Sequence, residues 1–342
     1  MNYRMRKRII FYSSVKDKSL FNTQKFYQID ILILKDLGYN VILSNKIMDA
    51  FKFWKYDIVF GYFFRYSFFF ILIAKIFGKQ SYLTGGIDAL DLNYAGKKAY
   101  YIQKIFFKLC YWITTKCIIV SREDLKHVEE IVGNNKSRIA YSEHTIDTSM
   151  FIGDRKLSEK ERNFVTVGWQ GTEGNVKRKG IDKALILFSS LKQKQEFANS
   201  KILILGRNGS GTLFLQRLIE KLGLKDSVII TGEVSEEEKI SYLKNNKYYF
   251  QLSDYEGFGI AALEALIAGD IVIHSGKGGL NNHIYDNHIK VNIDDDVTAQ
   301  SEAVYRQLIN IDTDAIEKSA IDCLQYYDNC RRRDDFKRIM EI

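Results

Sequence analysis

The sequence predicts an α/β protein made of two doubly wound parallel sheets. In both halves of the chain, short apolar runs that are typical of strands alternate with stretches of helical periodicity. This alternation indicates βαβ units, in which parallel strands lie between helices on both faces. The length of 342 residues is enough for two such domains. We therefore expect one domain over residues 1–153 and a second over 154–313, followed by a helix over 314–342.

The first half supplies the strands and helices of one domain. Its predicted strands are 9–12, 41–43, 58–60, 81–83 and 117–120, and its clearest helices are 24–37 and 94–113. The linker to the second domain is expected over 153–162, which is charged and has no apolar period. Proline is absent from the chain, so its turns depend on Gly, Asn, Asp and Ser.

The most informative segment lies in the second half and begins with the apolar run 248–252, which predicts a buried strand. Gly257 and Gly259 then indicate a tight turn, and the apolar residues that follow recur at the spacing of a helix. Glu256 is therefore expected at the carboxyl end of a strand and beside the N-terminus of a helix. Glu264 is expected further along the same helix.

The placement of these two carboxylates favours a site that binds hydroxyl groups. The carboxyl ends of parallel strands are where α/β sheets bind ligands, and a helix N-terminus at such an edge attracts phosphate. Carboxylates repel phosphate, so Glu256 and Glu264 are better suited to neutral hydroxyls, such as those of a sugar and a ribose. The sequence thus predicts hydroxyl-binding carboxylates beside a phosphate-binding helix end.

This segment resembles the retaining glycosyltransferases of family four, whose signature is close to S-x-x-E-G-F-G-x-x-x-L-E-A-x-x-x-G. The residues of this chain that match the signature are Ser253, Glu256, Gly257, Phe258, Gly259, Leu263, Glu264, Ala265 and Gly269. Upstream, residues 179–182 resemble the family's K-G-x-D segment, and downstream residues 275–279 resemble its glycine-rich loop. The resemblance covers residues 120–295 well and the N-terminal third loosely.

The resemblance implies the GT-B fold, in which two Rossmann-like doubly wound domains face each other across a cleft. The domain over 1–153 would bind the acceptor, and the domain over 154–313 would bind a nucleotide-diphosphate sugar. The helix over 314–342 would pack back on the first domain, as is common in this fold. No metal and no other cofactor is implied, because a lysine and helix N-termini supply positive charge to the diphosphate.

The resemblance also assigns roles to individual residues. Glu256 would bind hydroxyls of the donor sugar, Glu264 the 2′- and 3′-hydroxyls of the ribose, and Lys179 the departing diphosphate. Asp88 joins Glu256 and Lys179 in the catalytic group, because it ends a segment that resembles the family's H-G-x-D. The further donor-binding candidates are Arg178, Gly257, Phe258, Gly259, Gly232, Val234, Gly278 and Gly279.

Three positions leave an alternative open. The family usually has an Arg five residues before the Lys of K-G-x-D; here Arg178 is either its substitute or part of a basic surface turn. Asp88 follows Gly85, where the family has a His, so Asp88 is a site residue or an ordinary turn residue. Residues 294–296 imitate a D-x-D metal motif, but a polar loop before a helix explains them better. The four cysteines and five histidines show no spacing typical of metal ligands.

The charge distribution predicts an anionic partner for the first half. Residues 1–153 hold 23 Lys and Arg against 13 Asp and Glu, a net of +10, whereas residues 154–342 hold 27 against 29, a net of −2.

The aromatic segment 62–79 has an uncharged run of nine residues, and a bilayer span needs about 20. It is expected to be a core helix, with a membrane-contacting face as the alternative. The basic candidates for contact with anionic lipid are Arg4, Arg6, Lys7, Arg8, Arg65, Lys75 and Lys79.

The predicted function is the retaining, metal-independent transfer of a sugar from a nucleotide sugar to a saccharide or lipid-linked acceptor in the synthesis of a surface polysaccharide. We expect a cytoplasmic protein, peripheral on the inner face of the plasma membrane, because the basic N-terminus leads directly into a strand instead of a secretory signal. Nucleic acid is not an expected partner. Two alternatives remain open: a GT-B nucleotide-sugar epimerase, and a non-catalytic partner subunit that binds a sugar nucleotide.

Overall fold

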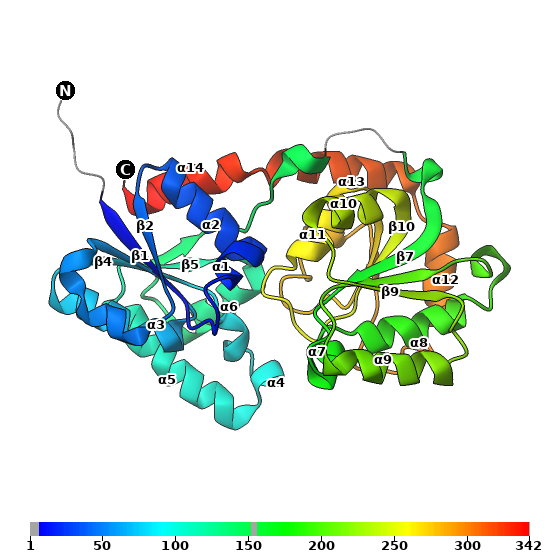
Figure 1. Cartoon of the computed structure of the whole chain (residues 1–342), viewed down its shortest axis with the longest axis horizontal. Coiled ribbons are helices and arrows are strands. Elements are labelled where there is room, and N and C mark those ends of the chain that lie inside the picture. The colour runs from blue at the N-terminus through cyan, green and yellow to red at the C-terminus, as the bar shows by residue number, and fades with distance from the viewer. Residues whose placement is uncertain (1–6, 152–155, 342) are drawn as a thin grey trace. The chain divides into compact units, whose positions relative to one another are not determined.

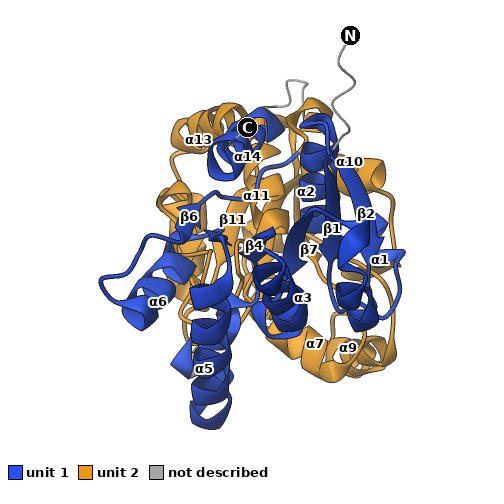
Figure 2. Ribbon diagram, turned by 90° about the vertical axis from the view of Figure 1, so that its left-hand side faces the viewer, with its two compact units in different colours: residues 1–146, 328–342 blue, residues 147–327 orange. Residues whose placement is uncertain are grey.

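The computed structural model describes residues 7–151 and 156–341 and divides the chain into two compact units (Figure 1). Unit 1 comprises Met1–Ile146 and Asp328–Ile342, and unit 2 comprises Asp147–Tyr327, as coloured in Figure 2. Among the described residues, each unit contains one six-stranded sheet in which the paired strands run parallel. Helices cover both faces of each sheet (Figure 1). The predicted class, two doubly wound parallel sheets, is therefore confirmed.

The sheet of unit 1 has the strand order β2-β1-β3-β4-β5-β6. Its strands are β1 (Arg8–Tyr12), β2 (Asn40–Ser44), β3 (Ile58–Tyr62), β4 (Gln80–Thr84), β5 (Lys116–Ile119) and β6 (Ile139–Tyr141). The chain reverses its direction of winding between the neighbours β1 and β3, which makes this pair the topological switch point. Aromatic residues fill the core there, and Phe11 of β1 stacks on Phe60 of β3 with ring centroids 5.4 Å apart.

The helices of unit 1 pack on both faces of this sheet. They are α1 (Leu20–Thr23), α2 (Lys25–Asp36), α3 (Phe64–Ile76), α4 (Leu92–Ala95), α5 (Lys97–Ile113), α6 (Arg122–Val132) and α14 (Asn329–Met340), with 3-10 turns η1 (Ile47–Phe51), η2 (Phe53–Lys55) and η3 (Ile87–Leu90). The single helix that we expected over 94–113 is divided, because Gly96 adopts a φ of +75° between α4 and α5. Only glycine takes this conformation without strain.

The sheet of unit 2 has the strand order β12-β11-β10-β7-β8-β9. Its strands are β7 (Glu161–Val167), β8 (Ile202–Leu205), β9 (Val228–Gly232), β10 (Asn246–Gln251), β11 (Ile271–His274) and β12 (Ile289–Lys290). Here the switch point lies between β7 and β10. Their side chains interlock in the core, where Phe164 of β7 stacks on Phe250 of β10 at 5.0 Å between centroids. The predicted strand over 248–252 is thus the central strand β10.

The helices of unit 2 also cover both faces of its sheet. They are α7 (Glu173–Arg178), α8 (Ile181–Leu191), α9 (Ser210–Lys221), α10 (Glu236–Asn245), α11 (Ile260–Ile267), α12 (Ser301–Ile309) and α13 (Thr313–Tyr326), with 3-10 turns η4 (Thr148–Phe151), η5 (Leu157–Glu159), η6 (Gln195–Phe197) and η7 (His283–Tyr285). A capping box begins α10: the Ser235 hydroxyl accepts from the Glu238 amide at 3.1 Å, and the Glu238 carboxylate accepts from the Ser235 amide at 2.7 Å.

The C-terminal segment differs from the single helix that we expected over 314–342. It forms two helices, because α13 ends at Tyr326 and the Asp328 side chain then accepts a hydrogen bond from the Cys330 amide at 2.8 Å, which starts α14. The division between the units falls at this break and at Ile146–Asp147, near but not at the expected boundaries 313/314 and 153/154. Helix α13 therefore belongs to unit 2, and α14 packs on α2 within unit 1.

A buried ion pair attaches α14 to the body of unit 1. The Arg332 guanidinium is fully buried, and its Nε and Nη2 donate to the two carboxylate oxygens of Asp30 on α2 at 2.7 and 3.0 Å. Its Nη1 donates to the carbonyl oxygen of Glu143 at 3.1 Å, and Tyr62 of β3 donates its hydroxyl to Asp30. Both charges are thus satisfied by several hydrogen bonds, as buried charges require.

The aromatic segment 62–79 forms α3, which is a core helix that also has an exposed face. Phe64, Ser67, Phe70, Ile71 and Ala74 are buried in unit 1. The exposed apolar residues of α3 are Tyr66, Phe69 and Ile76, and those of its packing partner α5 are Tyr101, Ile102, Ile105, Leu109 and Trp112. Over the described residues, no helix is both long and apolar enough to cross a membrane.

Candidate active site

Two loops meet at the switch point of unit 2, at the carboxyl ends of β7 and β10. The loop after β7 leads into the short helix α7 and then into Lys179 and Gly180, which stand before α8. Gly180 adopts a φ of +65°, and a Cβ there would lie 1.9 Å from the carbonyl oxygen of Leu252. Only glycine permits this approach, so the turn that carries Lys179 rests directly on the end of β10. The edge is the one at which doubly wound sheets bind ligands.

At this contact Lys179 and Glu256 form an ion pair. The Lys179 Nζ lies 2.6 Å from Glu256 Oε1, and the same oxygen accepts from Ser253 Oγ at 2.7 Å and from Gln251 Nε2 at 3.0 Å. The Glu256 side chain is 12% exposed and that of Lys179 is 24% exposed. Burial disfavours the ionised carboxylate, but the charge of Lys179 and the hydrogen bonds outweigh it and lower the pKa of Glu256 below its ordinary value. A carboxylate and an ammonium thus stand together, partly open to solvent.

The glycine-rich loop after β11 holds the backbone of Glu256. The Gly279 amide donates to the Glu256 carbonyl oxygen at 2.6 Å. Gly278 has a φ of +60°, and a Cβ there would lie 2.3 Å from that same oxygen; a Cβ at Gly279 would lie 2.6 Å from the Cα of Phe258. Both glycines are therefore required by close packing of two backbones, independently of any ligand.

The residues of the E-G-F-G segment have different structural roles. Gly259 adopts a φ of +86° as the residue that begins α11, whereas a Cβ at Gly257 would meet no atom within 4 Å. Phe258 is buried and packs edge-on against Tyr327, with ring centroids 5.9 Å apart. The side chain of Phe258 thus belongs to the core, so a donor would meet this residue through its backbone.

Glu264 lies in α11 with a side chain that is only 2% exposed, and it pairs with a lysine that the sequence analysis did not single out. The Nζ of Lys239, on α10, lies 2.7 Å from Glu264 Oε2 and 3.0 Å from an oxygen of Glu236. Burial disfavours the charge on Lys239, but the two carboxylates raise its pKa above the ordinary value. The predicted ribose-binding carboxylate is therefore held by a buried cation.

The remaining donor-binding candidates, Arg178, Gly232 and Val234, also lie in unit 2. The carbonyl oxygen of Arg178 accepts from the Asp254 amide at 2.9 Å, and the charge of Arg178 contributes to the lowered pKa of Glu256. Gly232 ends β9 with a φ of +78°, and its carbonyl oxygen accepts from the Gly206 amide at 2.9 Å. Val234 is half-buried in the loop before α10. Arg178 follows β7, and Gly232 and Val234 stand at and just after the end of β9, so all three lie toward the carboxyl edge of the parallel sheet.

Comparison with known proteins identifies this region. Residues 174–318 match the family model described as glycosyl transferases group 1, and this span contains the Lys179–Glu256 pair and Glu264. Unit 2 carries a group 1 glycosyl transferase domain.

Two curated relatives of this chain are mannosyltransferases by their names. The O-antigen chain mannosyltransferase RfbU of Salmonella typhimurium is 27% identical over 208 residues, which are 59% of this chain and 54% of RfbU. The GDP-mannose:cellobiosyl-diphosphopolyprenol alpha-mannosyltransferase of Xanthomonas oryzae is 26% identical over 161 residues, 47% of this chain and 40% of that enzyme. The chain thus matches about half the length of these relatives.

Solved structures extend the likeness to the whole chain. Sucrose-phosphate synthase from Thermosynechococcus elongatus aligns with a TM-score of 0.78, at 16% identity, over 98% of both chains. Anabaena HepE, in complex with UDP and glucose, aligns with a TM-score of 0.72, at 13% identity, over 98% of this chain and 99% of HepE. At this level of identity the likeness establishes the fold, and the predicted GT-B fold is confirmed.

The last catalytic candidate, Asp88, lies in unit 1, in the turn η3 that follows β4. Gly85 and Gly86 before it adopt φ values of +75° and +81°. Phe63, at the end of β3, also has a positive φ of +65°, which is strained for an aromatic residue, and its ring lies within 3.6 Å of a Cβ built at Gly85 or Gly86. No sequence pattern predicts this strained residue, because positive φ is expected only at Gly, Asn or Asp.

Asp294, in the D-x-D-like run 294–296, lies on the surface of the group 1 domain. It is 66% exposed on its side chain and pairs with Lys277. Across residues 7–151 and 156–341, no three His, Cys, Asp or Glu side chains group in a way that could hold a metal ion.

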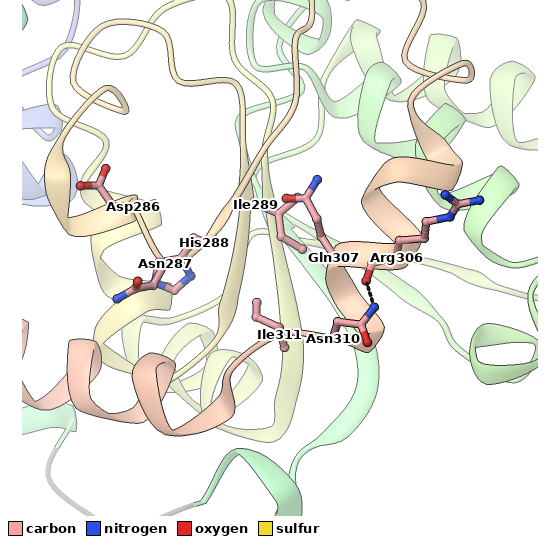
Figure 3. Close-up of a pocket in the computed structure, with 8 residues that line it drawn as sticks. All are labelled: Asp286, Asn287, His288, Ile289, Arg306, Gln307, Asn310 and Ile311. Atoms are coloured by element: carbon pink, nitrogen blue, oxygen red, sulfur yellow. Dashed lines mark hydrogen bonds between the residues drawn. The ribbon is translucent and has the colours of Figure 1, made fainter.

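A pocket of the group 1 domain lies at the opposite edge of its sheet (Figure 3). Its lining residues are Asp286, Asn287, His288, Ile289, Arg306, Gln307, Asn310 and Ile311. His288 accepts from the Val272 amide at 3.0 Å, and burial lowers the pKa of its imidazole to about 3. This pocket adjoins the amino end of β12, so it is separate from the edge that carries Glu256.

Proposed function

We propose that the chain is a retaining glycosyltransferase that moves a sugar from a nucleotide-diphosphate sugar to a lipid-linked saccharide acceptor in the synthesis of a surface polysaccharide. The observation that carries the proposal is the Lys179–Glu256 ion pair at the switch point of a group 1 domain. The names of the curated relatives, which include an enzyme acting on a diphosphopolyprenol, support the acceptor class. HepE in complex with UDP supports a nucleoside diphosphate as the donor's carrier.

The chemistry follows from the charges at the switch point. As the bond between the sugar and the diphosphate breaks, negative charge grows on the phosphate oxygens, and Lys179 is placed to stabilise it. Glu256 keeps its charge and accepts hydrogen bonds from the hydroxyls of the donor sugar, which fixes the sugar's orientation. Retention results when the departing diphosphate helps to deprotonate the acceptor on the face from which it leaves. The reaction requires no metal, because Lys179 supplies the positive charge.

Asp88 is the acceptor-side member of this proposal. It stands at the carboxyl end of β4, in the unit that carries the excess of basic residues. Its carboxylate would accept a hydrogen bond from an acceptor hydroxyl.

The two alternative functions can be distinguished by what the protein does with the donor. An epimerase would alter the donor without an acceptor, and a non-catalytic partner subunit would bind the donor and transfer nothing.

The role of Glu264 is tested by Glu264→Gln. The variant should bind nucleoside diphosphates about 10- to 100-fold more weakly, since a hydrogen bond to a charged group is worth about 1.5–3 kcal/mol. The turnover number should change less, because ribose contacts are the same in the ground and transition states. Calorimetry with UDP and GDP measures the affinity, with the exposed Glu237→Gln on α10 as control. Unchanged affinity in Glu264→Gln would contradict the ribose role.

The proposal also includes attachment to an anionic membrane through unit 1. Its basis is the α3–α5 face, formed by Tyr66, Phe69 and Ile76 of α3 and by Tyr101, Ile105, Leu109 and Trp112 of α5. Helix α5 has four lysines and no acidic residue, a pattern that suits anionic headgroups. Of the earlier lipid candidates, Arg4 and Arg6 lie outside the described residues, Arg8 pairs with Asp57, and Lys79 donates to backbone carbonyls. We place the reaction on the cytoplasmic face of the membrane.

Flotation with vesicles tests this attachment. Wild-type protein should float with phosphatidylserine vesicles at low salt, and much less with neutral vesicles. The triple variant Lys97→Gln, Lys98→Gln, Lys108→Gln should bind about 100-fold more weakly, at roughly 1 kcal/mol for each lysine near the surface. The control, Lys201→Gln, Lys221→Gln, Lys225→Gln, removes the same charge from unit 2. Equal losses in the two triple variants would mean that net charge, and not this face, causes binding.

A further inference from the structure

The Lys239–Glu264 ion pair is more buried than an ordinary surface ion pair, and it joins two helices. The two side chains come from different helices, α10 and α11, and are 11% and 2% exposed. A capping box and three acidic residues fix the first turn of α10, so Lys239 lies one turn into a well-anchored helix. An oxygen of Glu236 lies 3.0 Å from the same Lys239 ammonium, and the Glu236 side chain is the more exposed of the two carboxylates. The lysine thus bridges a buried carboxylate and a partly exposed one.

We propose that Lys239 is the positioning residue for ribose recognition: it keeps the buried Glu264 carboxylate ionised and oriented so that it accepts hydrogen bonds from the ribose hydroxyls of the donor. The inference rests on the proposed function, in which Glu264 binds the ribose. The inference adds the residue that allows a carboxylate as buried as Glu264 to accept hydrogen bonds from the ribose. Lys239 acts through Glu264 and is not itself required to touch the nucleotide.

The physical argument begins with the cost of a buried charge. A carboxylate that is removed from water and has no cation becomes protonated, and it then has weaker acceptor oxygens. The ammonium of Lys239, 2.7 Å from Glu264 Oε2, opposes that protonation. An ionised carboxylate offers about four lone-pair positions, so the pair with Lys239 is compatible with further hydroxyl donors at the same group.

Other ionisable groups lie near the pair, and the test must separate them. On α10 the neighbour is Glu236, and on β10 it is Tyr249, whose pKa is raised by burial and by the nearby carboxylates, so that it stays neutral. Helix α13, which packs on α11, buries Cys323. The Lys160–Asp270 pair lies beyond the C-terminal end of α11, and burial raises the pKa of Asp270 to about 7.

The test measures the affinity of full-length Lys239→Met for UDP and GDP, and for their 2′-deoxy forms, between pH 6 and pH 9. At pH 6 the variant should bind the ribonucleotides about 10- to 100-fold more weakly than the wild type, as expected for loss of hydrogen bonds to a charged group. Affinity should recover as the pH rises, because the unpaired Glu264 ionises only at higher pH. The 2′-deoxy ligands lack one of the two hydroxyls that Glu264 would bind, so they should show less of this dependence, whereas titration of Asp270 would affect both ligands and the wild type alike.

Three variants complete the experiment. Lys239→Arg should restore most of the ribonucleotide affinity, and Lys244→Met, on the same helix, should leave it unchanged. The double variant Lys239→Met, Glu264→Gln should bind no more weakly than Glu264→Gln alone and should be independent of pH. Circular dichroism checks that each variant is folded, and should Lys239→Met fail to fold, Lys239→Gln at the same pH values takes its place.

The outcomes distinguish this inference from the proposed function. If Glu264→Gln loses ribonucleotide affinity while Lys239→Met keeps the wild-type ratio of ribo- to deoxynucleotide affinity at every pH, the role of Lys239 is refuted and the ribose role of Glu264 stands. If Glu264→Gln binds both ligands as the wild type does, the ribose role itself is wrong. A loss in Lys239→Met that is the same for both ligands and for every pH would indicate a purely structural lysine.

Discussion

Lys179→Ala is expected to lower the turnover number about 10²- to 10³-fold, the loss that follows removal of one preorganised charge-stabilising donor. The reason is that the departing diphosphate gains charge as the bond to the sugar breaks, and Lys179 is held at the switch point of unit 2 by Gly180 and by Glu256. Release of nucleoside diphosphate under saturating donor measures the effect. Binding of the intact donor should weaken less than turnover falls.

A matched control is available two residues away. Lys177 lies in the last turn of α7, is 53% exposed and pairs with Glu173 one turn earlier, so Lys177→Ala should retain wild-type turnover. Lys179→Ala also removes the cation of Glu256, so its activity should be compared at several pH values, because the pKa of that carboxyl is expected to rise. Turnover within threefold of the wild type at all of them would remove Lys179 from the mechanism.

Arg332→Ala is expected to destabilise the protein by about 3–5 kcal/mol, the usual cost of removing one partner of a buried ion pair. The variant leaves the Asp30 carboxylate buried without its cation and deprives the carbonyl oxygen of Glu143 of its donor. Because the pair attaches α14 to α2, the loss should affect unit 1. Urea unfolding followed by circular dichroism measures it.

The neighbouring arginine supplies the control for this stability prediction. Arg333 is 38% exposed, with its nearest carboxylate at 3.9 Å, so Arg333→Ala should change stability by no more than about 0.5 kcal/mol. The double variant Asp30→Leu, Arg332→Met should recover part of the loss, since it removes both charges of the pair and leaves neither one buried without its partner. An Arg332→Ala variant as stable as Arg333→Ala would show that the pair contributes nothing.

Local signals explain why much of the candidate site could be predicted from the sequence. The strand β10, the loop around Glu256 and the helix α11 follow one another within about 20 residues, and strand composition, turn glycines and helical spacing are all properties of neighbouring residues. The parallel order of strands then places Glu256 at a carboxyl edge without any knowledge of distant contacts. The segment with Lys179 was found by its K-G-x-D pattern.

Features that depend on tertiary contacts could not be predicted in this way. Lys239 is 25 positions from Glu264, and in the sequence it is one charged residue on an acidic, polar helix. The break at Asp328 replaces a helix that the sequence pattern favours, because it depends on which unit each half of the segment joins. Phe258 matches the family signature, yet its ring packs against Tyr327 in the core. In each case the partner in space, and not the residue's own neighbours in the chain, decides the role.

The most direct test of the central claim, that unit 2 binds a nucleotide-diphosphate sugar without a metal, is a thermal-shift measurement with a panel of uridine and guanosine diphosphate sugars in the presence of EDTA. At a ligand concentration of about 100 Kd the melting temperature of the wild type should rise by roughly 5–10 °C for at least one donor. The rise should be smaller in Glu264→Gln. A panel that gives no shift, or a shift that appears only after Mg²⁺ or Mn²⁺ replaces EDTA, would contradict the account.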